Sequence, residues 1–160
     1  MKNNVKIYYG EGRGKSTAAL GYAMRKASEG MVVTLIQFLK GKNEKEQNFL
    51  NRLEPEIKVF RFAKQDAWFE DLSEEEQQEE IMNLRNGFHF CKKVITTGES
   101  NLVILDEVLG LVDRGVITLE ELRELLELKP DDVGLVLTGI VLPEELRPLA
   151  DEIYQIQADI

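Results

Sequence analysis

The sequence predicts an α/β fold in which helices cover a mainly parallel central sheet of about six strands. Short runs rich in β-branched and aromatic residues alternate along the chain with longer segments of helical period. The run from Met31 to Phe38 is almost continuously apolar, as expected for a strand buried on both faces. These observations predict three layers, with the sheet in the middle.

The predicted strands are short and rich in Val, Ile, Leu and aromatic residues. They cover residues 5–9, 31–38, 57–62, 101–106, 133–138 and 153–157. Helical periods lie between them, over 16–29, 44–53, a long segment from Ser73 to Gly98, a segment beginning at Thr118, and a short one that opens at Pro143. Ser73 and Thr118 are each followed three residues later by a glutamate, a pairing that satisfies the first N–H groups of a helix.

Composition narrows the class of protein. The chain has 160 residues, 43% of them hydrophobic and 31% charged, which predicts one folded domain over residues 1–160. Its formal charge of -9 disfavours nucleic acid as a partner. The single cysteine, Cys91, cannot form an intramolecular disulfide, the first residues contain no apolar signal core, and no apolar run approaches the length of a membrane span. We therefore expect a cytoplasmic protein with no membrane segment.

The most informative segment lies between the first predicted strand and the first predicted helix. It reads Gly10, Glu11, Gly12, Arg13, Gly14, Lys15, Ser16 and Thr17. Such a loop can turn backbone N–H groups towards phosphate oxygens, while the lysine adds a positive charge and the serine offers a hydroxyl to Mg²⁺. A glycine-rich turn without a ligand is the alternative, but the strand before and the helix after the loop favour a nucleotide site. The chain is thus predicted to be a single P-loop nucleotide-binding domain with a three-layer, P-loop NTPase-like fold.

The loop is one residue shorter than the usual phosphate-binding loop. The usual first glycine lies five positions before the second, and here that position is Tyr9. A shortened loop is expected to hold a triphosphate differently from an ordinary NTPase, in which the loop and its lysine lie at the bond that is cut. This spacing disfavours routine transfer of the γ-phosphoryl group.

Two consecutive carboxylates, Asp106 and Glu107, follow the apolar strand 101–106. The carboxyl edge of a parallel sheet, beside a phosphate loop, is where the Mg²⁺ of a bound nucleotide finds an acidic ligand. Acidic residues at this position can also simply cap the following helix. With the loop present, we expect Asp106 to be the stronger metal candidate and Glu107 the second, together with Ser16.

These motifs resemble those of the ATP:corrinoid adenosyltransferases, which act on cobalamin and cob(I)yrinic acid a,c-diamide. The resemblance covers most of the chain and includes the shortened loop, which the family shares. The other segments that resemble the family are Ile36-Gln37-Phe38-Leu39-Lys40-Gly41, Leu105-Asp106-Glu107-Val108, Thr118-Leu119-Glu120-Glu121-Leu122 with Lys129-Pro130, Leu137-Thr138-Gly139 and Leu149-Ala150-Asp151.

The resemblance implies that the 5′-deoxyadenosyl group of ATP is transferred to a cobalt(I) corrinoid and that tripolyphosphate leaves. Cobalt is then the nucleophile, so the protein needs no general base and instead orients the substrates, with Lys15 holding the leaving group. The family also implies Mg²⁺, a homodimer, and a flavoprotein as possible electron donor. Two alternatives stay open: a P-loop ATPase or small-molecule kinase, and a nucleotide-binding regulatory relative without transferase activity.

The aromatic residues Trp68 and Phe69 lie where the family has a loop near the corrinoid. In the family such aromatics displace the lower axial ligand of cobalt and ease its reduction, and ordinary core packing is the alternative role. The chain departs from the family at Ile140, where members usually have an arginine directly after Thr-Gly, and the resemblance implies that a contact to nucleotide or corrinoid is lost there. Because the sequence begins its first strand at Val5 and ends at Ile160, we expect any cover over the corrinoid to come from elsewhere or from a partner subunit.

Overall fold

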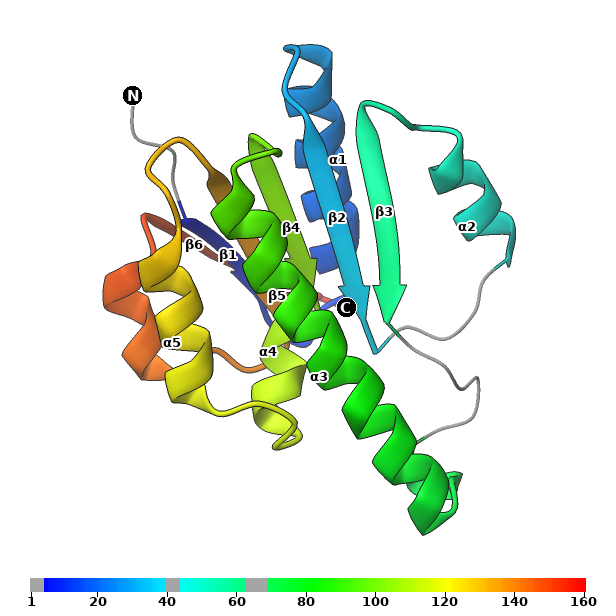
Figure 1. Ribbon diagram of the computed structural model, residues 1–160. Helices are drawn as coiled ribbons and strands as arrows, with labels where there is room; N and C mark the ends of the chain where they lie inside the picture. The colour runs from blue at the N-terminus through cyan, green and yellow to red at the C-terminus, as the bar shows by residue number, and fades with distance from the viewer. Residues whose placement is uncertain (1–4, 40–43, 63–68) are drawn as a thin grey trace.

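The computed structural model describes residues 5–39, 44–62 and 69–160, in which six strands form one sheet (Figure 1). The strands are β1 (Val5–Tyr9), β2 (Val33–Phe38), β3 (Ile57–Phe62), β4 (Leu102–Asp106), β5 (Gly134–Gly139) and β6 (Glu152–Gln155). Their order is β3-β2-β4-β5-β1-β6, and each neighbouring pair is parallel. The predicted α/β fold with a parallel six-stranded sheet is therefore confirmed.

Helices cover both faces of this sheet. They are α1 (Lys15–Ser28), α2 (Glu44–Asn51), α3 (Glu74–Thr97), α4 (Val108–Asp113) and α5 (Leu119–Leu128), with short 3-10 helices η1 (Phe69–Asp71) and η2 (Glu144–Leu149). Figure 1 shows α3, α4 and α5 on one face and α1 on the other, while α2 lies beside the edge strand β3. The structure thus has the predicted three layers.

The side chains of the central strands alternate between the two faces. On β2, Val33 and Leu35 join the cluster that contains Ala19 and Ala23 of α1. Ile36, the next residue of β2, belongs instead to the larger core beneath α3, α4 and α5. This period of two is the geometry of a strand buried on both faces, and it explains why the β2 sequence is nearly all apolar.

The long helix α3 begins and ends where the sequence predicts. Ser73 caps it through a capping box with Glu76, and Gly98 follows its last turn with a φ of 70°. The Cys91 thiol is buried in the larger core, and this burial raises its pKa well above the ordinary value. Beyond the sheet, the amino-terminal half of α3 projects past the carboxyl ends of the strands (Figure 1).

Several element boundaries differ from prediction by one or two residues, and one helix was not predicted. β2 begins at Val33 rather than at 31, and β6 covers Glu152–Gln155 rather than 153–157. The helix α4 was not predicted from the sequence, because its six residues span less than two turns and give no readable period. None of the helices in the described ranges has the length and apolar character needed to cross a membrane.

A charged contact joins α3 to α5. The Arg85 guanidinium donates to both carboxylate oxygens of Glu121, at 3.0 and 3.3 Å, and also to the Val116 carbonyl at 2.8 Å. The Arg85 hydrogen bond, together with the N–H of Thr118, lowers the pKa of Glu121 from its ordinary 4.5 to about 2. Both side chains are partly exposed, so solvent screening reduces what the pair contributes to stability.

We expect Glu121→Gln to lower the free energy of unfolding by about 0.5–1 kcal/mol at pH 7, because glutamine keeps the helix cap but loses the ion pair. Folding lowers the pKa of Glu121, so its contribution is fully present above pH 4.5 and is lost as the pH falls towards 2. The free energies of unfolding of the wild type and of Glu121→Gln should therefore approach each other as the pH falls. Urea unfolding at several pH values between 7 and 3 measures this difference. Glu124→Gln, an exposed change on the same helix, is the control, and a difference that stays constant with pH would contradict the prediction.

Candidate functional site

The glycine-rich loop joins β1 to the amino terminus of α1, at the carboxyl edge of the sheet. Gly14 caps the helix with a φ of 115°, a conformation that side chains other than glycine rarely adopt. Lys15 begins the helix and is only 8% exposed, and its Nζ donates to the Gly12 carbonyl at 2.9 Å. No carboxylate among the described residues forms an ion pair with Lys15, so a nearly buried positive charge lies at the positive end of the α1 dipole.

Two of the loop glycines have a role that the sequence did not reveal. The Gly12 N–H donates to the Ile156 carbonyl at 3.2 Å, and the Gly10 N–H donates to Gly139 and Ile140. A Cβ at Gly10 would collide with the Ile156 carbonyl oxygen, and one at Gly12 would lie 2.9 Å from the Ala158 nitrogen. The chain after β6 therefore packs directly against the loop, and glycine is required at both positions for this close approach.

A hydrogen-bonded group of three side chains lies beside the loop. Asp106, at the end of β4, is only 1% exposed, and its Oδ1 accepts hydrogen bonds from Ser16 at 2.9 Å and Thr138 at 2.7 Å. The Thr138 hydroxyl oxygen in turn accepts from the Glu107 N–H at 2.8 Å. This geometry follows from the strand order, because β5, which carries Thr138, lies between β4 and β1.

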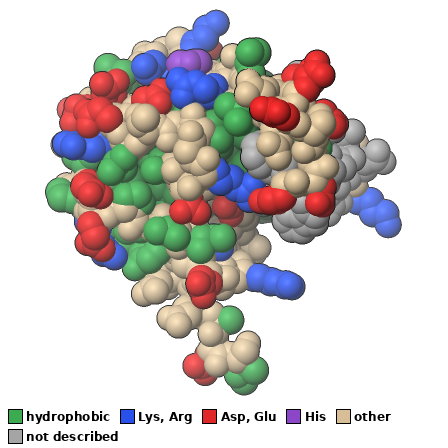
Figure 2. All heavy atoms as spheres, turned by 90° about the horizontal axis from the view of Figure 1, so that it is seen from below, with side chains coloured by type: hydrophobic (Ala, Val, Ile, Leu, Met, Phe, Trp, Pro, Cys, Tyr) green, Lys and Arg blue, Asp and Glu red, His purple; other side chains and the backbone are tan. Residues whose placement is uncertain are grey.

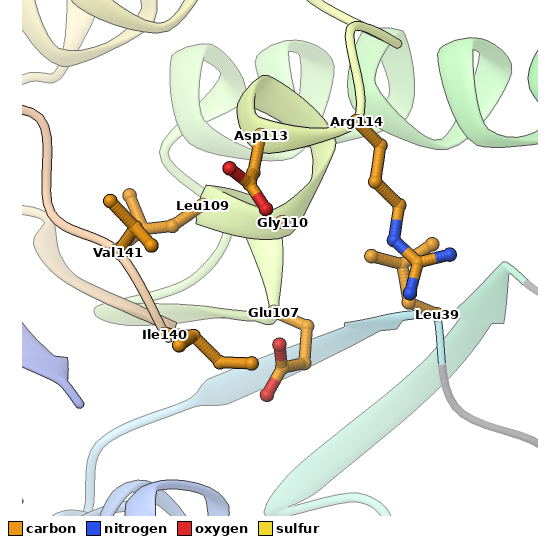
Figure 3. Close-up of a pocket in the computed structure, with 8 residues that line it drawn as sticks. All are labelled: Leu39, Glu107, Leu109, Gly110, Asp113, Arg114, Ile140 and Val141. Carbon is orange, nitrogen blue, oxygen red and sulfur yellow. The ribbon is translucent and has the colours of Figure 1, made fainter. Parts of the chain in front are cut away.

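The next residue, Glu107, belongs to a separate pocket of about 220 Å³ (Figure 3). Its backbone has a φ of 66°, which turns the chain directly from β4 into α4. The pocket is lined by Leu39, Glu107, Leu109, Gly110, Asp113, Arg114, Ile140 and Val141. Figure 3 shows Ile140 and Val141 on one side and Arg114 on the other.

The pocket lies at the carboxyl edge of the sheet, which faces the viewer in Figure 2. There, exposed hydrophobic side chains lie among acidic and basic ones. Ile140 and Val141, directly after β5, are 52% and 54% exposed. Crevices outside the carboxyl ends of parallel strands are the usual ligand sites of α/β proteins.

The structure places the predicted site residues in different surroundings. Ser16 and Asp106 are in direct contact, whereas Glu107 lines the neighbouring pocket. The side chains of Glu11, Arg13 and Thr17 are exposed on the loop and its helix. Trp68 lies outside the described residues, and of Phe69 the structure describes only its position at the start of η1.

Three residues that the structure places at the site were not predicted from the sequence. Thr138 bonds to Asp106, while Asp113 and Arg114 line the pocket from the end of α4. The position of Thr138 at the end of a predicted central strand was a usable signal, because the carboxyl ends of parallel strands meet at one edge. No comparable signal marked Asp113 and Arg114, because charged residues at a helix end are common on any surface.

Comparison with known families decides the assignment. Residues 1–159 match the model of the family described as ATP:corrinoid adenosyltransferase BtuR/CobO/CobP. The chain belongs to this family. The predicted resemblance is therefore confirmed, and the family's substrates, ATP and a corrinoid, are those that the sequence predicts.

Relatives in this family share about a quarter of their residues with the chain. A corrinoid adenosyltransferase of Escherichia coli (strain K12) is 26% identical over 152 residues, which cover 94% of this chain and 74% of the relative. The corrinoid adenosyltransferase CobA of Salmonella typhimurium (strain LT2) is 26% identical over 151 residues, with the same coverage of 94% and 74%.

A solved structure supports the fold assignment alone. The EssC ATPases 2 and 3 of Geobacillus thermodenitrificans match 98% of this chain and 33% of that chain, with a TM-score of 0.50 and 15% sequence identity. This likeness concerns the arrangement of the sheet and its helices, and it carries no information on the reaction.

We expect Thr138→Val to destabilise this adenosyltransferase-family fold by about 2 kcal/mol, because the change removes a buried hydroxyl from both Asp106 and the Glu107 N–H. Valine has nearly the same shape as threonine, so packing is preserved. Thr138→Ser keeps the hydroxyl and serves as the control. Urea unfolding measures the difference, and equal free energies of unfolding for Val and Ser would contradict the role of this hydroxyl.

Proposed function

We propose that this chain transfers the 5′-deoxyadenosyl group of ATP to the cobalt(I) of a corrinoid and releases tripolyphosphate. The electron pair of cobalt attacks the 5′-carbon, a cobalt–carbon bond forms, and the carbon–oxygen bond to the triphosphate breaks with its electrons on oxygen. Membership of the adenosyltransferase family supports this reaction. The main structural observation in favour of nucleotide binding is the nearly buried Lys15 at the amino terminus of α1, which has no carboxylate partner among the described residues.

Lys15 is suited to hold the leaving triphosphate. A nearly buried ammonium whose hydrogen bond, within the described ranges, goes to a carbonyl oxygen attracts an anion strongly, because burial has removed most of its hydration. The N–H groups of the first turn of α1 add to this attraction. We propose that the phosphates bind along this end of α1, between the loop of residues 10–17 and Asp106.

The residues beside the loop fit Mg²⁺ as part of a bound nucleotide. The hydroxyl of Ser16 and the carboxylate of Asp106 are hard oxygen donors 2.9 Å apart, the donor type that Mg²⁺ prefers. In the part of the chain that the structure describes, no group of three or more His, Cys, Asp or Glu could hold a metal ion. We therefore propose that Ser16 and Asp106 support Mg²⁺ together with phosphate oxygens and water, and that Glu107 faces the second substrate.

The corrinoid half of the site requires orientation rather than acid–base chemistry. Cobalt(I) is itself a strong nucleophile, so the protein's task is to align it with the 5′-carbon and to exclude water. We propose that the corrinoid lies over the carboxyl edge, next to the pocket of Figure 3, and that Trp68 and Phe69 displace its lower axial ligand.

The deciding experiment is anaerobic incubation of the protein with chemically reduced cobalamin and MgATP. We expect the absorption spectrum of an adenosylated corrinoid and an equal amount of intact tripolyphosphate. Lys15→Ala should weaken ATP binding ten- to a hundredfold, the loss expected for one charge-assisted hydrogen bond. Lys26→Ala, at the other end of the same helix, is the matched control. ADP and orthophosphate without adenosylated corrinoid would instead support the P-loop ATPase or kinase alternative.

A second prediction concerns the metal. Asp106→Asn keeps the shape of the side chain but removes the charge, so we expect the Mg²⁺ concentration for half-maximal ATP binding to rise about tenfold. Calorimetric titration of ATP at several Mg²⁺ concentrations measures this without turnover. Asp131→Asn, an exposed change before β5, is the control. An unchanged Mg²⁺ dependence would make Asp106 a structural residue only.

The setting of the reaction is also part of the proposal. We propose that the protein works in the cytoplasm as a homodimer, without nucleic acid or membrane partners, and that a flavoprotein supplies the electrons that reduce cobalt. The single buried Cys91 and the formal charge of -9 support this setting. The resemblance to the family supports the dimer and the electron donor.

A further inference from the structure

The segment 156–158, directly after β6, runs beside the glycine-rich loop. The Ile156 N–H donates to the Tyr9 carbonyl at 2.7 Å, and the Ile156 carbonyl accepts from the Gly12 N–H at 3.2 Å. The first of these bonds continues the parallel pairing of β1 with β6, and the second reaches into the loop. A Cβ at Gly14 would lie 3.9 Å from Cγ2 of Ile156, so the side chain also lies near the loop. Ile156 therefore ties the loop to the edge strand β6.

Gly12 links this segment to Lys15. Its N–H is held by the Ile156 carbonyl, and its own carbonyl accepts a hydrogen bond from the Lys15 Nζ at 2.9 Å. An ammonium group has three N–H donors, so one of them fixes the side chain and two remain for phosphate oxygens. The path from Ile156 through Gly12 thus determines where the positive charge of Lys15 lies.

Space, and not backbone conformation, requires glycine at position 12. Gly10 and Gly14 have a positive φ, whereas Gly12 does not, so other residues can adopt its backbone conformation. A Cβ at Gly12 would, however, lie 2.9 Å from the Ala158 nitrogen and 3.0 Å from the Gln157 Cα. Any side chain at this position would push the loop and the segment 156–158 apart.

We infer that Ile156 is a positioning residue for the leaving triphosphate, which acts through Gly12 on Lys15 and thereby sets the affinity of the loop for phosphate. The inference rests on the proposed function, because it requires the loop to bind the phosphates of ATP. A side chain that is held in place before its ligand arrives loses less freedom on binding, and the ligand is bound more tightly for this reason.

Ile156→Pro tests this path, because proline has no N–H to donate to the Tyr9 carbonyl. Gln155 belongs to β6, and the extended conformation of a strand is the one that a following proline favours. The probe is inorganic tripolyphosphate with Mg²⁺, and calorimetry on the full chain measures its Kd. We expect Ile156→Pro to raise this Kd about tenfold, the loss of about one hydrogen bond, while Ile156→Val keeps both backbone bonds and changes it less than about twofold.

Gly12→Ala is a second variant, which places a Cβ against the segment and leaves the sequence of the segment intact. We expect it to raise the Kd for tripolyphosphate about tenfold as well. Gly21→Ala is the matched control, because a Cβ at Gly21 in α1 would meet no atom within 4 Å. Urea unfolding shows whether each variant is folded, and where only one of the two variants folds, its Kd decides.

A double-mutant cycle separates this path from a general loss of structure. In the Lys15→Ala background, Ile156→Pro and Gly12→Ala should each change the Kd less than about twofold, because the charge through which they act is absent. An unchanged Kd in the folded variants, or an effect of the same size with and without Lys15, would overturn the inference. A wild type that binds no tripolyphosphate would overturn it too.

The transfer reaction with reduced cobalamin and MgATP is measured separately, so that the two proposals can fail independently. If Ile156 and Lys15 are coupled in tripolyphosphate binding but no adenosylated corrinoid forms, the proposed function fails and the positioning role of Ile156 stands. If adenosylated corrinoid forms and the cycle shows no coupling, the positioning role alone fails.

Discussion

The carboxylate of Asp106 is the constraint on which the candidate site depends. It is almost fully buried, and a buried carboxylate is tolerated only when donors surround it. Its donors come from the loop after β1, through Ser16, and from the end of β5, through Thr138. Three strands that are far apart in the sequence must therefore end at the same level. The glycine-rich loop is therefore held in place by the sheet as well as by its own sequence.

The same strand end also separates two halves of the site. Asp106 faces the loop, whereas Glu107 adopts a left-handed conformation and opens the pocket under α4. Leu39, after β2, also has a positive φ of 60° and lines the same pocket. Such conformations cost about 1 kcal/mol or more each for residues other than glycine, and they persist where the surrounding structure requires them. Their presence at the ends of two neighbouring strands indicates that packing maintains the shape of this edge, although these residues alone would prefer a negative φ.

The sequence predicted those features whose signal is local or periodic. The long helix α3, both capping boxes and the buried strand β2 were readable because period and cap residues lie within one segment. The short helix α4 gave no period, and the reason for glycine at positions 10 and 12 lies almost 150 residues away, in the backbone of residues 156–158. Asp113 and Arg114 needed the fold itself, because only the pocket distinguishes them from ordinary surface charges.

The charges along the carboxyl edge are arranged in the order that the proposed reaction requires. The loop end carries the nearly buried Lys15 and the positive end of α1, which suit a departing tripolyphosphate. The pocket end combines apolar side chains with charged side chains of both signs, from Glu107, Asp113 and Arg114. The two ends of this edge therefore offer different surroundings, a positive one that suits the departing anion and a partly apolar one beside it.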